Sequence, residues 1–262
     1  MQLTILEWPL KWWISSVLFA FTAVLIKKIY YEIFMFKKLP AIALAFVSCL
    51  SIAQSDYPNR PVTWVVPFAA GGPTDALARS IADVTSKQFG QSIIIENTPG
   101  AGGTIGATKV SRATPDGYTF LVGHMGYMGA APALYKKLNY NPVADFEATF
   151  RFPDTPLVLM VRNDHPAKNV KELYEYAKKN PDQVFMGNAG LGSSSHLIAA
   201  LVANADGADV KHVPYKGAGP ALIDVVGGQI DGMYDQTNTA FPQITEKRVR
   251  ALAVTSKTRC HS

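Results

Sequence analysis

The sequence has few cysteines and few charged residues for its length. Only two of its 262 residues are cysteine and 17% are charged, which excludes a disulfide framework and a four-cysteine zinc site. The formal net charge is +5, but residues 1–53 hold five lysines against two glutamates, so most of the basic excess lies there. The remaining residues are close to neutral and contain no cluster of five like charges. This balance provides no basic stripe for a nucleic-acid partner.

The common nucleotide and metal motifs are also missing. There is no GxxxxGK[ST] loop, and the dinucleotide fingerprint fails because Ile105 stands where a third glycine should follow Gly100 and Gly102. None of the five histidines lies within four residues of another, which gives a metal site little support. We therefore expect no cofactor and no bound metal.

Residues 1–53 have the composition of a targeting region. From Met35, two lysines precede the apolar run Leu39–Leu50, and small residues precede Gln54, as in a secretory signal peptide at 35–53. A second apolar stretch lies upstream of it. We interpret residues 1–34 as an over-extended start, with a membrane anchor at 12–31 as the alternative. Export through the signal peptide predicts a periplasmic protein.

The body alternates short apolar strands, glycine-rich turns and amphipathic helices, which is typical of parallel βαβ units. Strands are expected near residues 62–68, 92–96 and 118–123, and again near 156–162, 184–186, 210–214, 230–234 and 249–256. We predict an α/β fold of two lobes, each a doubly wound sheet. The first lobe comprises residues 54–156 and 250–262, and the second comprises residues 157–249.

Four turns rich in small residues fall at strand-to-helix junctions: Gly71–Gly72, Gly100–Gly103, Gly187–Ser195 and Gly217–Gly219. Glycines allow a close approach of the backbone, and helix N-termini favour anions. Four such turns in two lobes predict a small-anion site in the cleft beyond the strand ends. His124, which follows a strand, is a further candidate to line it.

A hydrolase is the alternative interpretation, because Ser194 and His196 lie close together. The surrounding sequence departs from a GxSxG nucleophile elbow, since His196 stands in place of the second glycine. Adjacent serine and histidine also rarely reach catalytic geometry. Helix capping is the simpler role for these serines.

Taken together, the loops resemble the Bug family of periplasmic solute-binding proteins, the receptors of tripartite tricarboxylate transporters. The likeness covers roughly residues 55–259. The matching segments are Tyr57–Val62, Val66–Asp75, Glu96–Gly106, Pro115–Tyr118, Gly190–Leu197, Val213–Gly217, Pro220–Leu222, Gly228–Asp231 and Arg250–Thr258.

The resemblance implies a two-lobed type II periplasmic-binding-protein fold that closes by a hinge on a small carboxylate, such as a tricarboxylate, a dicarboxylate, an amino acid or an aromatic acid. It implies a monomer that is not an enzyme and that delivers its ligand to membrane permease subunits. Together with His124, the ligand-binding residues carried over by position are Phe68, Ala69, Gly72, Thr74, Asp75, Asn97, Gly102, Gly103, Asn188, Ser193, Ser194, His196, Tyr215, Lys216, Gly217 and Asp235.

Three departures from the family pattern stand out. Ala69-Ala70 replaces the residues usual beside the first glycines, and the stretch from Tyr234 to Thr239 follows the family only loosely. The sequence stops at Ser262, where the family continues. We expect the first lobe to be incomplete at the C-terminus and the product to be marginally stable, since apolar surface would be exposed.

Overall fold

The structure is a computed structural model that describes residues 57–258. The chain divides into two units, Met1–Tyr57 and Pro58–Ser262, and the following account concerns the second. The predicted signal peptide and the alternative membrane anchor lie outside the described residues. Among residues 57–258, no helix is long and apolar enough to cross a membrane.

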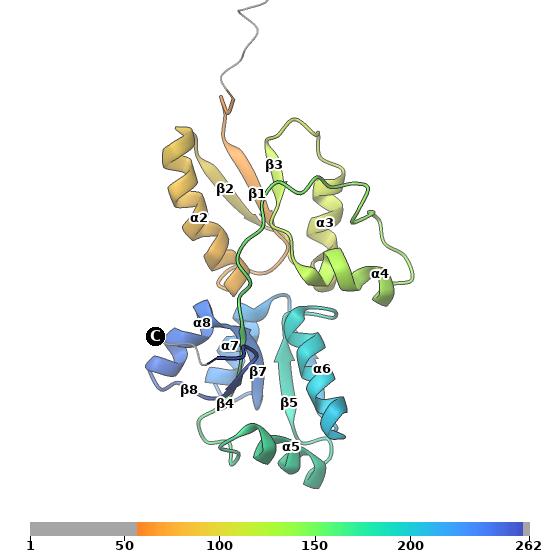
Figure 1. The fold of residues 1–262 in the computed structure, drawn as a ribbon, viewed down its shortest axis with the longest axis vertical. Coiled ribbons are helices and arrows are strands. Elements are labelled where there is room, and N and C mark those ends of the chain that lie inside the picture. The colour runs from red at the N-terminus through yellow and green to blue at the C-terminus, as the bar shows by residue number, and fades with distance from the viewer. Residues whose placement is uncertain (1–56, 259–262) are drawn as a thin grey trace, which may run out of the picture. The chain divides into compact units, whose positions relative to one another are not determined.

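The first lobe, residues 58–156, is built on a three-stranded parallel sheet in the order β2-β1-β3. The strands are β1 (Val62–Val66), β2 (Ile93–Asn97) and β3 (Thr119–Leu121). α2 (Pro73–Phe89) packs on β1 and β2, and α3 (Thr104–Ser111) packs on β1 and β3, as Figure 1 shows. The short helical segments Ala101–Gly103, Gly126–Ala130 and α4 (Ala131–Leu134) complete this lobe.

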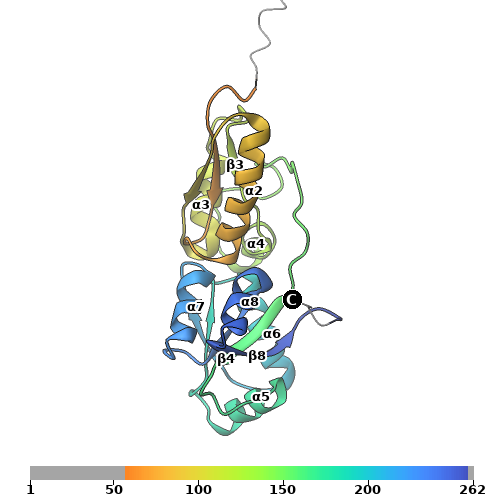
Figure 2. The same ribbon diagram turned by 90° about the vertical axis from the view of Figure 1, so that its left-hand side faces the viewer.

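The second lobe, residues 157–258, has a five-stranded sheet in the order β6-β5-β7-β4-β8. The strands are β4 (Leu157–Arg162), β5 (Phe185–Asn188), β6 (Lys211–Pro214), β7 (Gly232–Gln236) and β8 (Val249–Val254). β5 is parallel to β6 and β7, whereas β4 is antiparallel to β7 and β8. The helices are α5 (Val170–Lys179), α6 (Ser194–Asp206), α7 (Ala218–Val226) and α8 (Thr237–Thr245), and Figure 2 shows them around the sheet.

β4 explains why both faces of this sheet are covered. Its residues from Leu157 to Val161 are all apolar, and successive side chains of a strand point to opposite faces. Leu159 and Val161 enter a core with α5 and α6, while Val158 and Met160 enter a second core with α7 and α8. The predicted doubly wound α/β arrangement is therefore present in this lobe.

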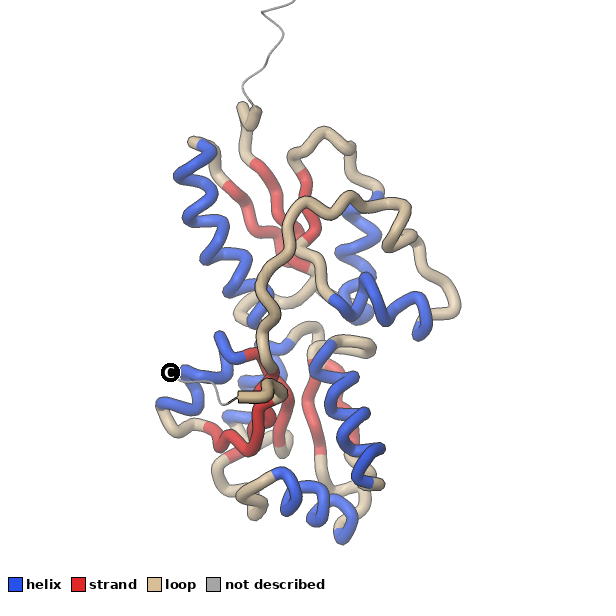
Figure 3. Tube along the Cα trace, viewed as in Figure 1, coloured by secondary structure: helices blue, strands red, loops and turns tan. Residues whose placement is uncertain are grey.

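The position of β8 corrects one predicted boundary. The sequence analysis assigns residues 250–262 to the first lobe, but Arg250–Val254 pair with β4 in the second sheet. The chain passes from α4 to β4 through one long loop segment, visible in Figure 3. Among the described residues there is no second passage. Residues 249–254 of the strand predicted at 249–256 pair with β4, so the apolar pattern of this strand does not require a return to the first lobe.

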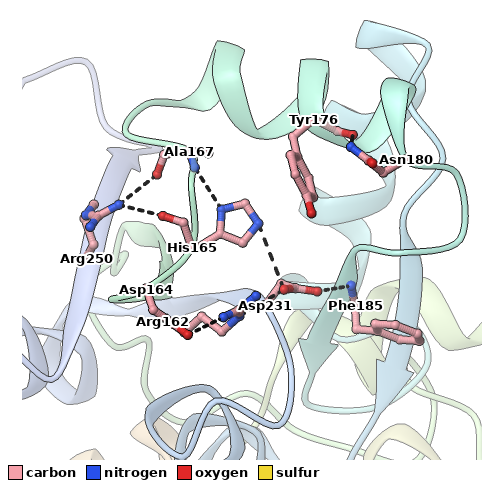
Figure 4. A network of polar contacts seen from close by, with 9 residues as sticks. All are labelled: Arg162, Asp164, His165, Ala167, Tyr176, Asn180, Phe185, Asp231 and Arg250. Carbon is pink, nitrogen blue, oxygen red and sulfur yellow. Dashed lines mark hydrogen bonds and ion pairs between the residues drawn. The ribbon is translucent and has the colours of Figure 1, made fainter.

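A polar cluster lies beside the second sheet and is drawn in Figure 4. Asp231 accepts hydrogen bonds from Arg162 Nε (3.1 Å) and from the Phe185 amide (2.8 Å). Arg250 donates to the carbonyl groups of Asn163, His165 and Ala167. These bonds fix the loop between β4 and α5, and they tie β8 to it.

Candidate functional site

A narrow crevice, partly open to solvent, lies where the two lobes meet, and its free space for water-sized molecules is only about 20 Å³. None of its lining residues is a lysine or an arginine. The first lobe contributes Phe68, Gly72, Pro73, Thr74 and His124; the second contributes Leu157, Ala189, Ser193, Ser194, Ser195, Ala218, Tyr234, Asp235 and Gln236.

Four helices begin at this crevice. Gly72, Ser193 and Gln236 are the N-cap residues of α2, α6 and α8, and Ala218 is the first residue of α7. The unpaired N–H groups and the dipole of a helix give its N-terminus a partial positive charge. The crevice can therefore attract an anion through backbone groups alone.

The glycines of the predicted anion loops have a second role, because they bring the two lobes together. The Ala69 amide donates to the Lys216 carbonyl at 2.9 Å. A Cβ on Gly219 would lie 3.0 Å from Gly72 N, and a Cβ on Gly126 would lie 2.9 Å from Gly192 O. Gly102 similarly faces the Leu191 carbonyl. The lobes thus meet backbone to backbone, where a side chain would separate them.

Asp75 does not line the crevice; it holds the first loop in place. Its buried carboxylate accepts from the Gly71 amide (3.0 Å), from Arg79 Nε and from Asn97 Nδ2 (2.9 Å). Burial by itself would raise the pKa of Asp75, but Arg79 and the two other donors hold that pKa below its usual range. Asn97 also donates to the Phe68 carbonyl. Both residues position the loop that carries Phe68 and Gly72.

His124 lines the crevice as a neutral ring. Its Nδ1 accepts from the Gly126 amide at 3.0 Å, so the ring proton sits on Nε2, which lies 3.1 Å from Ser194 Oγ. Burial lowers the pKa of His124 to about 4. Because Nε2 donates to Ser194 Oγ, the serine hydroxyl proton can point into the crevice.

This geometry gives no support to the hydrolase interpretation. The histidine beside Ser194 is His124 rather than His196, and its Nε2 donates a hydrogen bond to the serine hydroxyl instead of accepting one. The Nδ1 atom of His196 accepts from the Gly192 amide (3.3 Å), and its ring contacts His212. A serine nucleophile needs a base that accepts its proton, and neither ring is placed to do so.

Asp235 is the acidic residue of the crevice lining. It is 2% exposed and stands near the end of β7, opposite Val158 of β4. Thr239 Oγ1 donates to its Oδ2 at 2.7 Å. Burial raises the pKa of Asp235 to about 6, against the lowering effect of Thr239 and the Gln236 amide.

Seven of the predicted ligand-binding residues line the crevice and ten do not. Those in the lining are Phe68, Gly72, Thr74, His124, Ser193, Ser194 and Asp235. The ten outside it are Ala69, Asp75, Asn97, Gly102, Gly103, Asn188, His196, Tyr215, Lys216 and Gly217.

Several of these ten residues make contacts within the protein. The Tyr215 hydroxyl donates to Asp224 at 2.6 Å, and Gly103 lies against the ring of Tyr127. Asn188 is fully buried; its Oδ1 accepts from the Gly190 amide, and its Nδ2 has no partner among the described residues.

Half of the lining is not among the individually predicted ligand-binding residues. Ala189, Ser195 and Ala218 lie in turns that were predicted to form the anion site, whereas Pro73, Leu157, Tyr234 and Gln236 lie outside those turns. Ala218 and Gln236 were detectable as helix starts after short strands. Leu157 and Tyr234 belong to apolar strands, and nothing in such a run marks the residue at the open end. Within residues 57–258, no group of three histidine, cysteine or acidic residues could hold a metal ion.

Comparison with known proteins agrees with this architecture. Residues 77–262 match the model described as tripartite tricarboxylate transporter family receptor, and the chain belongs to that family. A UPF0065 protein from Agrobacterium vitis is 44% identical over 207 residues, covering 79% of this chain and 60% of the relative. The chain thus spans about three-fifths of the length of that relative.

Two solved structures are similar in sequence and in fold. The periplasmic binding protein BugD is 48% identical with a TM-score of 0.72, covering 78% of this chain and 68% of BugD. MatC from Rhodopseudomonas palustris, solved with bound malate, is 43% identical with a TM-score of 0.74, covering 78% of this chain and 69% of MatC. The periplasmic-binding-protein fold is therefore established.

Proposed function

We propose that this chain is a solute-binding receptor that holds a small carboxylate in the crevice between its lobes. The observation that carries the proposal is the convergence of four helix N-termini on a crevice whose lining contains no lysine or arginine. Backbone N–H groups and the hydroxyls of Thr74 and Ser194 are donors suited to a carboxylate. Malate in the related MatC structure supports the ligand class.

The mechanism follows from the contacts between the lobes. A ligand that reaches groups of both lobes stabilises the state in which the lobes touch, because it binds that state better than any open one. The glycine contacts allow this approach without trapping side chains. Phe68 and His124 cover the first-lobe side, with ring centroids 5.2 Å apart, and exclude water from the bound carboxylate.

The proposal is tested by measuring thermal unfolding of the full chain with citrate, succinate, malate, aspartate, glutamate and benzoate. A ligand at 100 times its Kd stabilises the folded state by about 2.7 kcal/mol. We expect at least one carboxylate to raise Tm, with its Kd then measured by calorimetry. If none of them changes Tm, the receptor function is wrong.

Ser194→Ala removes a hydroxyl from the crevice, and we expect it to weaken binding about tenfold, as for the loss of one hydrogen bond to a charged group. Ser80→Ala is the matched control, since that hydroxyl donates to the Ala76 carbonyl on an exposed helix turn. Equal affinity of the two variants would contradict the placement of the ligand. Ester hydrolysis lost on Ser194→Ala would instead establish the hydrolase.

The receptor role further implies a monomeric periplasmic protein that delivers its ligand to membrane permease subunits of a tripartite tricarboxylate transporter. The family membership supports this partner. Co-purification with the permease in the presence of ligand, and its loss without ligand, is the expected outcome. Sedimentation analysis of the purified chain measures its oligomeric state, and a monomer is the expected result.

A further inference from the structure

Asp235 is unlike the other strongly buried carboxylates of the described chain. Asp75 is paired with Arg79, and Asp231 is paired with Arg162. Asp235 is 2% exposed and has no ion-pair partner within residues 57–258. Its donors there are the Thr239 hydroxyl and the backbone amide of Gln236, both neutral.

A buried carboxylate without a cation is costly to the fold, because it has lost its hydration and gained only neutral partners. Burial accordingly raises the pKa of Asp235 to about 6, but at pH 7.5 the group is still mostly ionised. Asp235 lies in the crevice lining. A ligand in the crevice can therefore supply the hydrogen-bond donor or cation that Asp235 lacks.

The same position restricts what the ligand can be. A carboxylate placed against Asp235 would be repelled and would find an acceptor where it needs a donor. The helix N-termini and Ser194 supply donors elsewhere in the same lining. The crevice therefore has one group that requires a donor from the ligand, alongside several groups that donate to it.

Resting on the receptor function proposed above, we infer that Asp235 is a specificity-determining residue that accepts a hydrogen bond from a hydroxyl or ammonium group on the ligand. The preferred ligand class is then a small carboxylate that also carries such a donor, a hydroxy acid or an amino acid. A plain carboxylate of the same skeleton leaves Asp235 without a partner. Unpaired buried groups are the strongest basis for discrimination between closely similar ligands.

The test compares succinate, malate and aspartate, which share four carbons and two carboxylates and differ in one substituent. Calorimetry on the full chain at pH 7.5 is expected to give malate or aspartate at least tenfold tighter binding than succinate. If the carboxylate screen selects another skeleton, the same comparison is made with that acid and its hydroxy and amino derivatives. Malate tighter than aspartate identifies a hydroxyl as the donor, and the reverse identifies an ammonium group.

Asp235→Leu is expected to reduce this preference to within twofold, and Asp235→Asn to abolish the preference for aspartate while keeping an acceptor for a hydroxyl. Thr239→Val is the matched control, because it removes the neighbouring donor and keeps the carboxylate, so the preference should persist. Circular dichroism verifies that each variant is folded, and Asp235→Asn remains informative if the leucine variant unfolds.

The outcomes separate the two proposals. If succinate binds as tightly as malate and aspartate, the role of Asp235 is overturned and the receptor function stands. The same conclusion follows if a preference for aspartate survives Asp235→Asn, or if a preference for malate survives Asp235→Leu. If no carboxylate binds the unmodified chain, the receptor function itself fails.

Discussion

The two lobes each bury a carboxylate near the surface where they meet, and they treat it in opposite ways. Asp75 of the first lobe accepts from an arginine, an asparagine and a backbone amide, and its pKa is held below the usual range. Asp235 of the second lobe has neutral donors only, and burial raises its pKa to about 6. The hydrogen bonds of Asp75 stabilise a loop, whereas Asp235 keeps a negative charge that has no cationic partner among the described residues.

This difference distinguishes a structural acid from a functional one without reference to conservation. Asp75 lies in the first turn of α2, and Asp235 lies near the end of β7, just before α8. Both therefore stand close to a helix N-terminus, and their sequence contexts look alike. The distinction lies in whether an arginine is within reach, and Arg79 is one helical turn from Asp75. Two predictions test the contrast between these carboxylates directly, and two extend it to other residues at the junction of the lobes.

The largest effect is expected for Asp75→Ala. It removes the acceptor of three donors. The Gly71 amide then loses its partner and Asn97 Nδ2 keeps only the Phe68 carbonyl, which should cost about 2–4 kcal/mol of unfolding free energy. Urea denaturation measures the loss. Asp83→Ala, in the same helix, breaks only the exposed ion pair with Lys87, and less than about 1 kcal/mol is expected. Equal costs would show that Asp75 has no special structural role.

Asp235→Asn should raise the unfolding free energy, whereas Asp75→Ala lowers it. The folded pKa of about 6 lies above the ordinary value of 3.8, so the folded state prefers the protonated acid, and its ionisation destabilises the fold as pH rises through 6. The neutral asparagine should therefore stabilise the ligand-free chain at pH 7.5 by up to about 3 kcal/mol. The gain should vanish at pH 3.5, below both pKa values.

A constant difference between Asp235→Asn and the unmodified chain from pH 3.5 to 7.5 would contradict this origin of the effect. Asp209→Asn, on the exposed carboxylate near Lys211, is the control and should change stability little at either pH.

His124 extends the contrast to the first-lobe side of the crevice. Burial lowers its pKa from 6.5 to about 4, so between these values only the unfolded chain binds the proton. Stability contributed by the neutral ring is thus lost as pH falls from 6.5 to 4, by about 2 kcal/mol at pH 5. His124→Gln should flatten this part of the stability profile. An unchanged slope would refute the assignment of a buried neutral ring.

The smallest expected effect concerns the contact between the lobes. Gly219 lies in helix α7, and alanine has a higher helix propensity than glycine. The Cβ of an alanine at this position would, however, lie 3.0 Å from Gly72 N in the other lobe. We expect Gly219→Ala to preserve stability and to weaken carboxylate binding about tenfold. Gly129→Ala, whose Cβ would meet nothing closer than 3.8 Å, should bind normally. Similar affinities in both variants would mean that the lobes need not touch here.

Much of the fold was predictable from the sequence, because its apolar strands and small-residue turns alternate with a regular period. The sequence predicts a strand near residues 156–162, and β4 is found at Leu157–Arg162. The boundary at residue 250 was wrong because an apolar strand does not specify which sheet it joins. β8 pairs with β4, a partner close in space but about 90 residues earlier.

The candidate site was predictable only in part. Polar residues and glycines in the turns after strands, such as Thr74 and Ser194, are predictable as ligand-binding residues from their type and position. Asp75 and Asn97 were predicted to bind the ligand for the same reason, but they bond to each other within the protein. The sequence does not show that Asp75 is already paired with Arg79. Leu157 and Tyr234 enter the crevice through strand geometry, which no local pattern records.

The contacts of Gly72, Gly126 and Gly219 also determine which mutagenesis strategy can detect the interface. Their contacts across the interface are made by main-chain atoms, so alanine scanning of larger side chains does not remove these contacts. Substitutions that add a side chain to one of these glycines are needed to detect the interface. By the same reasoning, residues such as Phe68, Thr74 and Gln236 can be varied to change ligand preference while the main-chain surfaces that meet stay the same.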